Sequence, residues 1–258
     1  MPEKPAEQGS DPRPCCRTLV PPYDRNSASA TVEVLETSRL PFGAVLIPTL
    51  DAAEVPALEI TIAFLRRRHP GHPVALQLPR SPDSTPLHVA WRAGRLGVRA
   101  ILLQGDPVAP ALRTMLTHSE DLAADLLDWF EAARLGPAAA LSPAGRANVD
   151  AGGRALMGEV AERLQVAERT LRDRFAAAGV PPPAAWAGLA RALSAALHLQ
   201  RHPDASLASS ALASGYSDQP ALAHALRREF DLTPVQVRTV LGWEPLLDRW
   251  TARWPDRR

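Results

Sequence analysis

Aromatic residues, cysteine and net charge are all scarce in this sequence. Phe, Trp and Tyr together make up 5% of the 258 residues, and the formal net charge at pH 7 is only +1. A chain so close to neutral is not a polycation that binds nucleic acid by charge alone. Hydrophobic residues nevertheless make up 46%, which is enough for packed cores, and the length suits two domains.

Only two cysteines occur, Cys15 and Cys16, side by side in a proline-rich stretch. Neighbouring cysteines rarely pair with each other, and two cysteines do not make the spaced set of ligands found in structural zinc sites. We therefore expect two reduced thiols, with no metal and no cofactor.

Long apolar runs are also missing. A membrane-spanning helix needs about 20 consecutive apolar residues, and the sequence contains no such run. Its first residues, MPEKPAEQGSDPRPCC, lack the apolar segment of a secretory signal. We therefore expect a soluble, cytoplasmic protein with no membrane partner.

The first half of the chain alternates between two kinds of segment. Residues 1–30 are rich in proline, serine and charge and are predicted to be a disordered tail. Over residues 31–117, segments typical of strands alternate with segments typical of helices, which predicts βαβ units and a parallel sheet. The predicted strands are 31–36, 42–50, 72–78 and 98–107, the last including its loop. The predicted helices are 55–68, 85–97 and 107–117.

Residues 118–153 are predicted to be a linker helix followed by a hinge. The helix covers 118–135, with Ser119 as its N-cap, and a stretch rich in Gly, Pro and Ala follows. Three apolar residues share one face of this helix: Leu122, Leu126 and Phe130. Every periodic segment after it is helical. We assign 154–245 to an all-α domain and 246–258 to a tail.

Two stretches of the helical half, 157–175 and 206–230, follow one plan. Each starts with a short helix that carries a small residue, and a turn follows four residues later. A second helix then presents apolar residues at positions i and i+4, as in a helix-turn-helix, in which steeply crossing helices need a small residue at their closest approach. In the first stretch these positions are Ala161, Gln165, Leu171 and Phe175, and in the second Ala211, Gly215, Leu222 and Leu226.

The outward face of each second helix is then free to enter a DNA groove. Arg and Gln can read base edges, and Arg also neutralises phosphate. We expect base contacts from Arg169, Arg172, Gln219 and His224, and phosphate or rim contacts from Arg174, Arg227 and Arg228. Asp173 and Ala223 lie on the same faces, and a carboxylate there can accept a hydrogen bond from cytosine. The charge agrees in sign, because residues 151–258 hold 14 Arg and 11 acidic residues.

Residues 154–240 resemble the DNA-binding domain of AraC/XylS-type regulators. The features that carry the resemblance are Gly215-Tyr216, Ser217-Asp218, Phe230, Thr233-Pro234 and Arg238. The resemblance implies two helix-turn-helix units that bind successive major grooves on one face of double-stranded DNA. RNA polymerase and a second copy of the chain are further candidate partners. The sequence departs from the family pattern at Gln165, Asp173, Ser210, Pro220-Ala221 and Asp231.

Residues 43–117 resemble the second half of a receiver domain of two-component systems. A receiver needs a phosphate-accepting Asp after its third strand and a Lys after its fifth. Here those positions fall near Pro48-Thr49 and on Gln104, and Asp51 lies about two residues late. We therefore predict a non-phosphorylated, receiver-like domain that senses a signal or dimerises.

Two other functions stay open. The same fold can act as a helical protein-interaction module that regulates another factor without binding DNA. An α/β enzyme would need polar residues at the carboxyl ends of its strands, where the sequence offers only Thr49, Asp51, Gln104 and Asp106. No common catalytic motif occurs, and His69 and His72 flank a Pro-Gly turn that predicts a solvated loop. We expect a regulator and not an enzyme.

Overall fold

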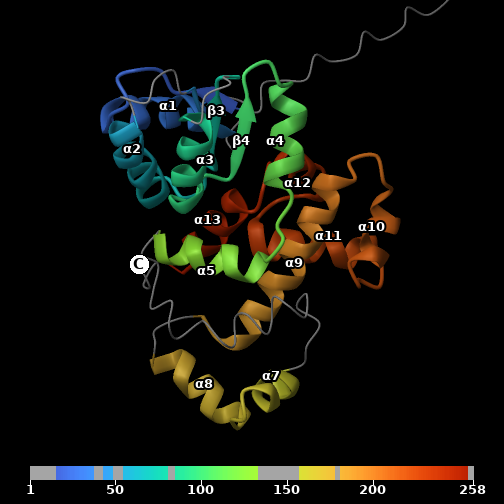
Figure 1. Ribbon diagram of the computed structural model, residues 1–258. Coiled ribbons are helices and arrows are strands. Elements are labelled where there is room, and N and C mark those ends of the chain that lie inside the picture. Colours follow the sequence, from blue (N-terminus) through green and yellow to red (C-terminus); the bar gives the residue numbers. More distant parts are fainter. Residues whose placement is uncertain are drawn as a thin grey trace, which may run out of the picture.

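The computed structural model describes residues 16–37, 43–48, 55–80, 85–132, 157–177 and 181–254. Its N-terminal part is a four-stranded parallel sheet with helices, and its C-terminal part is helical (Figure 1). The predicted fold class, an α/β domain followed by an all-α domain, is confirmed.

The sheet follows the order of the chain. Its strands are β1 (Cys16–Thr18), β2 (Ala44–Pro48), β3 (Val74–Leu78) and β4 (Ala100–Leu103), and each pairs in parallel with its neighbour in sequence. The helices of this part are α1 (Arg25–Thr37), α2 (Val55–Arg68), α3 (Thr85–Arg95) and α4 (Val108–Leu116). Residues of α1, α2 and α3 pack on one face of the sheet, as expected when successive parallel crossovers proceed in one direction with the usual right hand.

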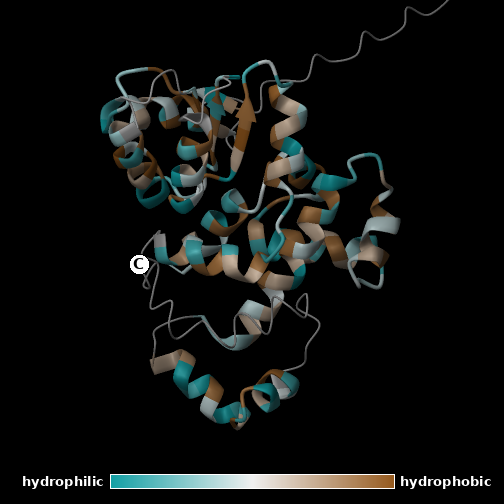
Figure 2. Ribbon diagram, in the orientation of Figure 1, coloured by the Kyte–Doolittle hydropathy of each residue, from teal (hydrophilic) through white to brown (hydrophobic). Residues whose placement is uncertain are grey.

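The two faces of the sheet form two separate clusters. One contains Val45, Ile47, Val74 and Leu76, together with residues of α1, α2 and α3. The other contains Ala44, Leu46, Ala75, Ala100 and Leu102, together with Leu112 and Leu116 of α4 and Leu241 from near the C-terminus. Since both faces are covered, the strands read as continuous apolar runs, and β4 is brown in Figure 2.

Two predictions for the N-terminal part are wrong. Residues 31–36 belong to α1 and not to a strand, because Ala28, Val32 and Leu35 bury one helical face. The predicted tail at 1–30 ends earlier than expected, since Cys16 begins β1 and Arg25 begins α1. Cys15, Thr49 and Asp51 lie outside the described residues.

The strand order does not confirm the receiver resemblance. Receivers have the flavodoxin-like order 2-1-3-4-5, in which the direction of strand addition reverses once. The resemblance covers β2, β3 and β4, which lie side by side as strands 3, 4 and 5 do in that order, but other parallel sheets share this arrangement, so the receiver-like domain is not confirmed. The backbone carbonyl of Gln104 accepts a hydrogen bond from Arg80 Nε at 2.9 Å, and Asp106 pairs with Arg80 at 2.6 Å. The polar residues after β4 therefore stabilise a turn.

The helical part shares one large core. Its helices are α5 (Leu122–Ala132), α7 (Met157–Arg163), α8 (Glu168–Ala177), α9 (Pro183–Arg201), α10 (Leu207–Ala213), α11 (Gln219–Phe230), α12 (Pro234–Thr239) and α13 (Glu244–Ala252). Trp186 and Trp250 meet edge to face in this core, with ring centroids 5.0 Å apart. The long helix α9 lies between the α7–α8 pair and the α10–α11 pair in Figure 1, and it contacts α8, α10 and α11.

Three further details differ from the sequence predictions. The linker helix starts at Leu122, and Asp121 rather than Ser119 caps it by accepting from the Ala124 amide at 3.0 Å. The predicted tail at 246–258 holds most of α13, where Trp250 is buried. His72 is buried as well, and its Nδ1 lies 3.0 Å from the Gly43 carbonyl oxygen, so the turn beside it is not a solvated loop. The predicted hinge at 136–153 lies outside the described residues.

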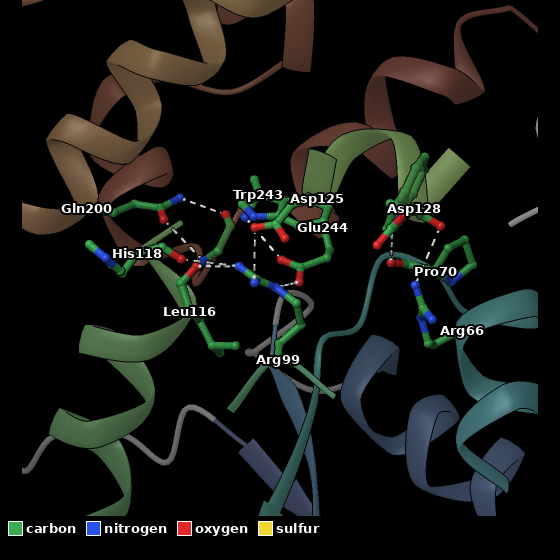
Figure 3. Close-up of polar contacts among 12 residues, drawn as sticks. Arg66, Pro70, Arg99, Leu116, His118, Asp125, Asp128, Gln200, Trp243 and Glu244 are labelled. Carbon is green, nitrogen blue, oxygen red and sulfur yellow. Dashed lines mark hydrogen bonds and ion pairs between the residues drawn. The ribbon is translucent and has the colours of Figure 1, made fainter. Parts of the chain in front are cut away.

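The two parts of the molecule meet along a polar seam (Figure 3). Arg99, just before β4, donates to the buried carboxylate of Glu244 at 2.5 Å and stacks 4.7 Å from the centroid of Trp243. Burial raises the pKa of Glu244, and Arg99 opposes that shift. The side-chain amide of Gln200 bonds the backbone N–H and C=O of Gly242, both at 3.1 Å. These contacts fix the end of the helical part against the sheet.

Candidate nucleic-acid interface

Both predicted helix-turn-helix units are present, and their turns have the same geometry. In each turn one residue is left-handed, Gln165 with φ 53° and Gly215 with φ 75°. The next amide donates to the carbonyl of the small residue in the first helix. These bonds are Val166 to Ala161 at 3.0 Å and Tyr216 to Ala211 at 2.9 Å. The first unit therefore makes this turn without glycine, at the steric cost of a left-handed Gln.

The second helices bury the predicted residues. Leu171 and Phe175 of α8 and Leu222 and Leu226 of α11 are all almost inaccessible to solvent. The small residues Ala161 and Ala211 are buried in the same core. The carboxylate of Asp218 caps α11 by accepting from the Ala221 amide at 2.7 Å, and Pro220 occupies the first turn, where its missing N–H costs nothing.

The candidate DNA-binding residues of α8 are all exposed. The Arg169 side chain is 91% accessible, and its Nε lies 3.9 Å from a carboxylate oxygen of Asp173. Arg172 pairs with Glu168 of its own helix at 2.7 Å. Arg174 is exposed and enters no ion pair with the part of the chain that the structure describes. Exposed pairs one helical turn apart are weak, so a phosphate can displace them.

The candidate residues of α11 fall into two groups. Gln219, His224 and Arg227 are exposed, while Ala223 is half-buried. Arg228 donates to the buried carboxylate of Glu229 at 2.7 Å, and its backbone carbonyl accepts from Arg253. Arg228 therefore already makes contacts within the protein, which leaves it less available for DNA. The spacing of residues along α11 gave no sign of this, because Arg253 lies 25 residues away.

Other residues of the resemblance have structural roles. Thr233 and Gln236 form a reciprocal capping box at the start of α12. The Arg238 guanidinium donates to the Ala205 carbonyl and so ties α12 to the segment before α10. Phe230 is buried, and Asp231 ends α11 in the left-handed conformation, with φ 54°. Tyr216 lies under Arg191, and burial raises the pKa of its hydroxyl to about 12.

Comparison with known families agrees with this geometry. Residues 160–239 match a family model described as a helix-turn-helix domain. This match supports a helix-turn-helix domain of the AraC type in the C-terminal part of the chain. Comparison with the curated proteins and with the solved structures gave no match.

Two kinds of feature are absent from the described residues. No group of three or more His, Cys, Asp or Glu among them could hold a metal ion. No helix among them is long and apolar enough to cross a membrane.

Proposed function

We propose that this protein is a sequence-specific transcription regulator that binds DNA through α8 and α11. Its N-terminal α/β domain is then a sensing or dimerisation domain that works without phosphorylation. The observation that carries the proposal is the repeat of one turn geometry in two units, each with an exposed polar second helix. A single short helical hairpin would be weak support, whereas two units joined by α9 reproduce the arrangement of the family.

The seam supports a signalling role for the α/β domain. Leu241 lies in the core beneath the sheet, and it follows α12 directly. Arg201, at the end of α9, donates to the Thr117 carbonyl after α4 at 2.8 Å. A change in the α/β domain would therefore reach the two elements that hold the second unit.

The first test is a selection of bound fragments. The purified full chain is mixed with sheared genomic DNA of its source at low and high salt, and the retained fragments are sequenced. We expect a shared motif of two half-sites about one helical turn apart, with affinity that falls steeply as salt rises because phosphate contacts release counterions. Absence of enrichment even at low salt would contradict the proposal.

The contact residues can be tested by a double variant. We expect Arg169→Ala with Gln219→Ala to abolish selectivity for the selected motif, because one candidate base contact is lost from each unit. Titration of labelled motif and scrambled duplexes measures this, with far-UV circular dichroism to confirm unchanged helicity. Arg113→Ala on α4 is the matched control, since Arg113 is exposed and lies outside both units. Unchanged selectivity in the double variant would refute the assignment of contacts.

A protein-interaction module is the second candidate. Two apolar side chains of the second unit are exposed, Leu212 by 67% and Val235 by 66%, and exposed apolar residues can mark contacts between proteins. On this hypothesis, Leu212→Ser with Val235→Ser would abolish regulation, and the Arg169→Ala, Gln219→Ala variant would keep it. The regulator hypothesis predicts instead that the Arg169→Ala, Gln219→Ala variant loses regulation.

A further inference from the structure

An arginine-rich depression lies on the α/β domain, away from the helix-turn-helix turns. Its volume is about 700 Å³, which is within the range of small-molecule sites. Five arginines and one acidic residue line it: Arg25, Arg66, Arg67, Arg68, Arg95 and Glu131. The depression therefore has an excess of positive charge, although the whole chain is nearly neutral.

Most of the arginines of this depression have no ion-pair partner among the described residues. In the part of the chain that the structure describes, no ion pair engages Arg25, Arg67, Arg68 or Arg95. Arg66 is half-buried and donates to two backbone carbonyls, of Leu96 at 2.7 Å and of Asp128 at 3.5 Å. Burial lowers the pKa of Arg66, and the nearby Asp128 carboxylate opposes this only in part. An anion bound here would compensate the positive charge of the half-buried Arg66.

The depression also has an apolar part. The half-buried Phe64 ring lies among the arginines, with the Arg25 guanidinium 6.0 Å from its centroid. Ile60 belongs to the same surface and is 60% exposed. A ligand that fits must therefore combine anionic groups with a flat or apolar group.

We propose that this depression binds a small organic phosphate of the size of a nucleoside diphosphate. Its phosphates would lie among Arg67, Arg68 and Arg95, since guanidinium groups form paired hydrogen bonds to phosphate oxygens. Its aromatic or apolar part would lie against Phe64 and Ile60. A bare inorganic anion would leave the apolar part unused.

The site is placed to pass a signal to the DNA-binding half. Glu131 on its wall belongs to α5, and Arg66 also reaches α5 through Asp128 (Figure 3). Leu126, Trp129 and Phe130 of the same helix lie in the core of the helical part. The sensing role rests on the proposed function, but occupation of the site by the ligand does not.

The test is calorimetric titration of the full chain, without DNA, with three probes: adenosine diphosphate, pyrophosphate and adenosine. We expect adenosine diphosphate to bind more tightly than pyrophosphate, and adenosine not to bind. Arg67→Gln with Arg68→Gln should weaken the binding of adenosine diphosphate at least about tenfold, because the variant loses two charge-assisted contacts to phosphate. Phe64→Leu should weaken adenosine diphosphate and leave pyrophosphate unchanged. Arg113→Gln, an exposed arginine on α4, is the matched control.

Three results would overturn the proposal. The first is equal binding of adenosine and adenosine diphosphate. The second is an unchanged affinity of the Arg67→Gln, Arg68→Gln variant for adenosine diphosphate. The third is a loss of nonspecific DNA affinity in that variant, together with competition between duplex DNA and adenosine diphosphate. The last would assign the arginines to the DNA backbone. If the full chain binds adenosine diphosphate but retains no genomic fragment, the proposed ligand site stands and the proposed function as a DNA-binding regulator is refuted.

Discussion

At the scale of single residues, Ser210 is the clearest misfit of the helix-turn-helix domain. It is fully buried in α10, and its hydroxyl has no hydrogen-bond partner among the described residues. A buried polar group without a partner costs about 1–3 kcal/mol. We expect Ser210→Ala to raise the free energy of unfolding by about 1 kcal/mol, measured by urea denaturation.

The matched control is Ser209→Ala. Ser209 is exposed, and its hydroxyl donates to the Ser206 carbonyl at 3.0 Å, so its removal should bring no gain. A loss of stability in Ser210→Ala would show that the hydroxyl has a partner in solution. The family pattern prefers an apolar residue at this position, which is how the sequence alone singled it out.

Side-chain types were easier to predict than their partners. Exposure of Arg169, Gln219 and His224 agrees with the helical spacing, because a residue's face follows from its neighbours three and four positions away. The hydrogen bond from Arg253 to the Arg228 carbonyl was not predictable, since Arg253 follows a separate helix, α13. The arginine-rich depression was missed because its residues come from four helices and a loop.

At the scale of elements, the two turns offer a direct comparison. A left-handed conformation costs a residue with a side chain about 1–2 kcal/mol, and glycine escapes that cost but loses more chain entropy on folding. We expect Gln165→Gly to stabilise the protein by about 0.5–1 kcal/mol and Gly215→Gln to destabilise it by about 1 kcal/mol. Chemical denaturation followed by circular dichroism measures both.

The pair of variants serves as its own control, since the turns have equivalent hydrogen bonds. Equal and small effects of both substitutions would mean that the left-handed residue does not limit the stability of either turn. By the same reasoning, Asp231, the other left-handed residue with a side chain in the part of the chain that the structure describes, would carry no energetic cost.

Elements with a long, clear period were predicted well. Helices α2, α3 and α11 and strands β2, β3 and β4 lie where the apolar pattern placed them. The error at residues 31–36 has a simple cause: Thr31, Val32 and Val34 form a short β-branched run, which is typical of strands. The buried positions of α1 begin three residues earlier, at Ala28, inside a segment whose composition indicated a tail.

At the scale of the whole molecule, the seam joins two halves that the sequence suggested only as separate domains. Glu244 is buried and pairs with Arg99. Removing one partner of a buried pair costs about 3–5 kcal/mol, and Asp125, 3.4 Å from Arg99, offsets part of that. We expect Glu244→Ala to lower the free energy of unfolding by about 3 kcal/mol and to broaden or split the thermal transition in calorimetry.

Arg172→Ala is the control for that experiment, because its partner Glu168 is exposed and such pairs contribute at most about 1 kcal/mol. If both variants lost the same small amount of unfolding free energy, the seam would not couple the halves.

A glycine is also required in the seam, since a Cβ on Gly242, with φ 83°, would lie 2.6 Å from a Glu244 oxygen. The sequence could not predict the seam because its residues are up to 145 positions apart.

The length of helix α9 determines how far apart the two helix-turn-helix units lie. It has 19 residues, eleven of them buried along it, and at about 1.5 Å per residue it extends about 28 Å. Since α8, α10 and α11 all contact this one helix, it sets the distance and the rotation between α8 and α11. Under the proposed function, the protein would therefore recognise the spacing of two half-sites as well as their sequence. About five extra base pairs between the half-sites would turn the second half-site to the far side of the duplex, and only one unit would then bind.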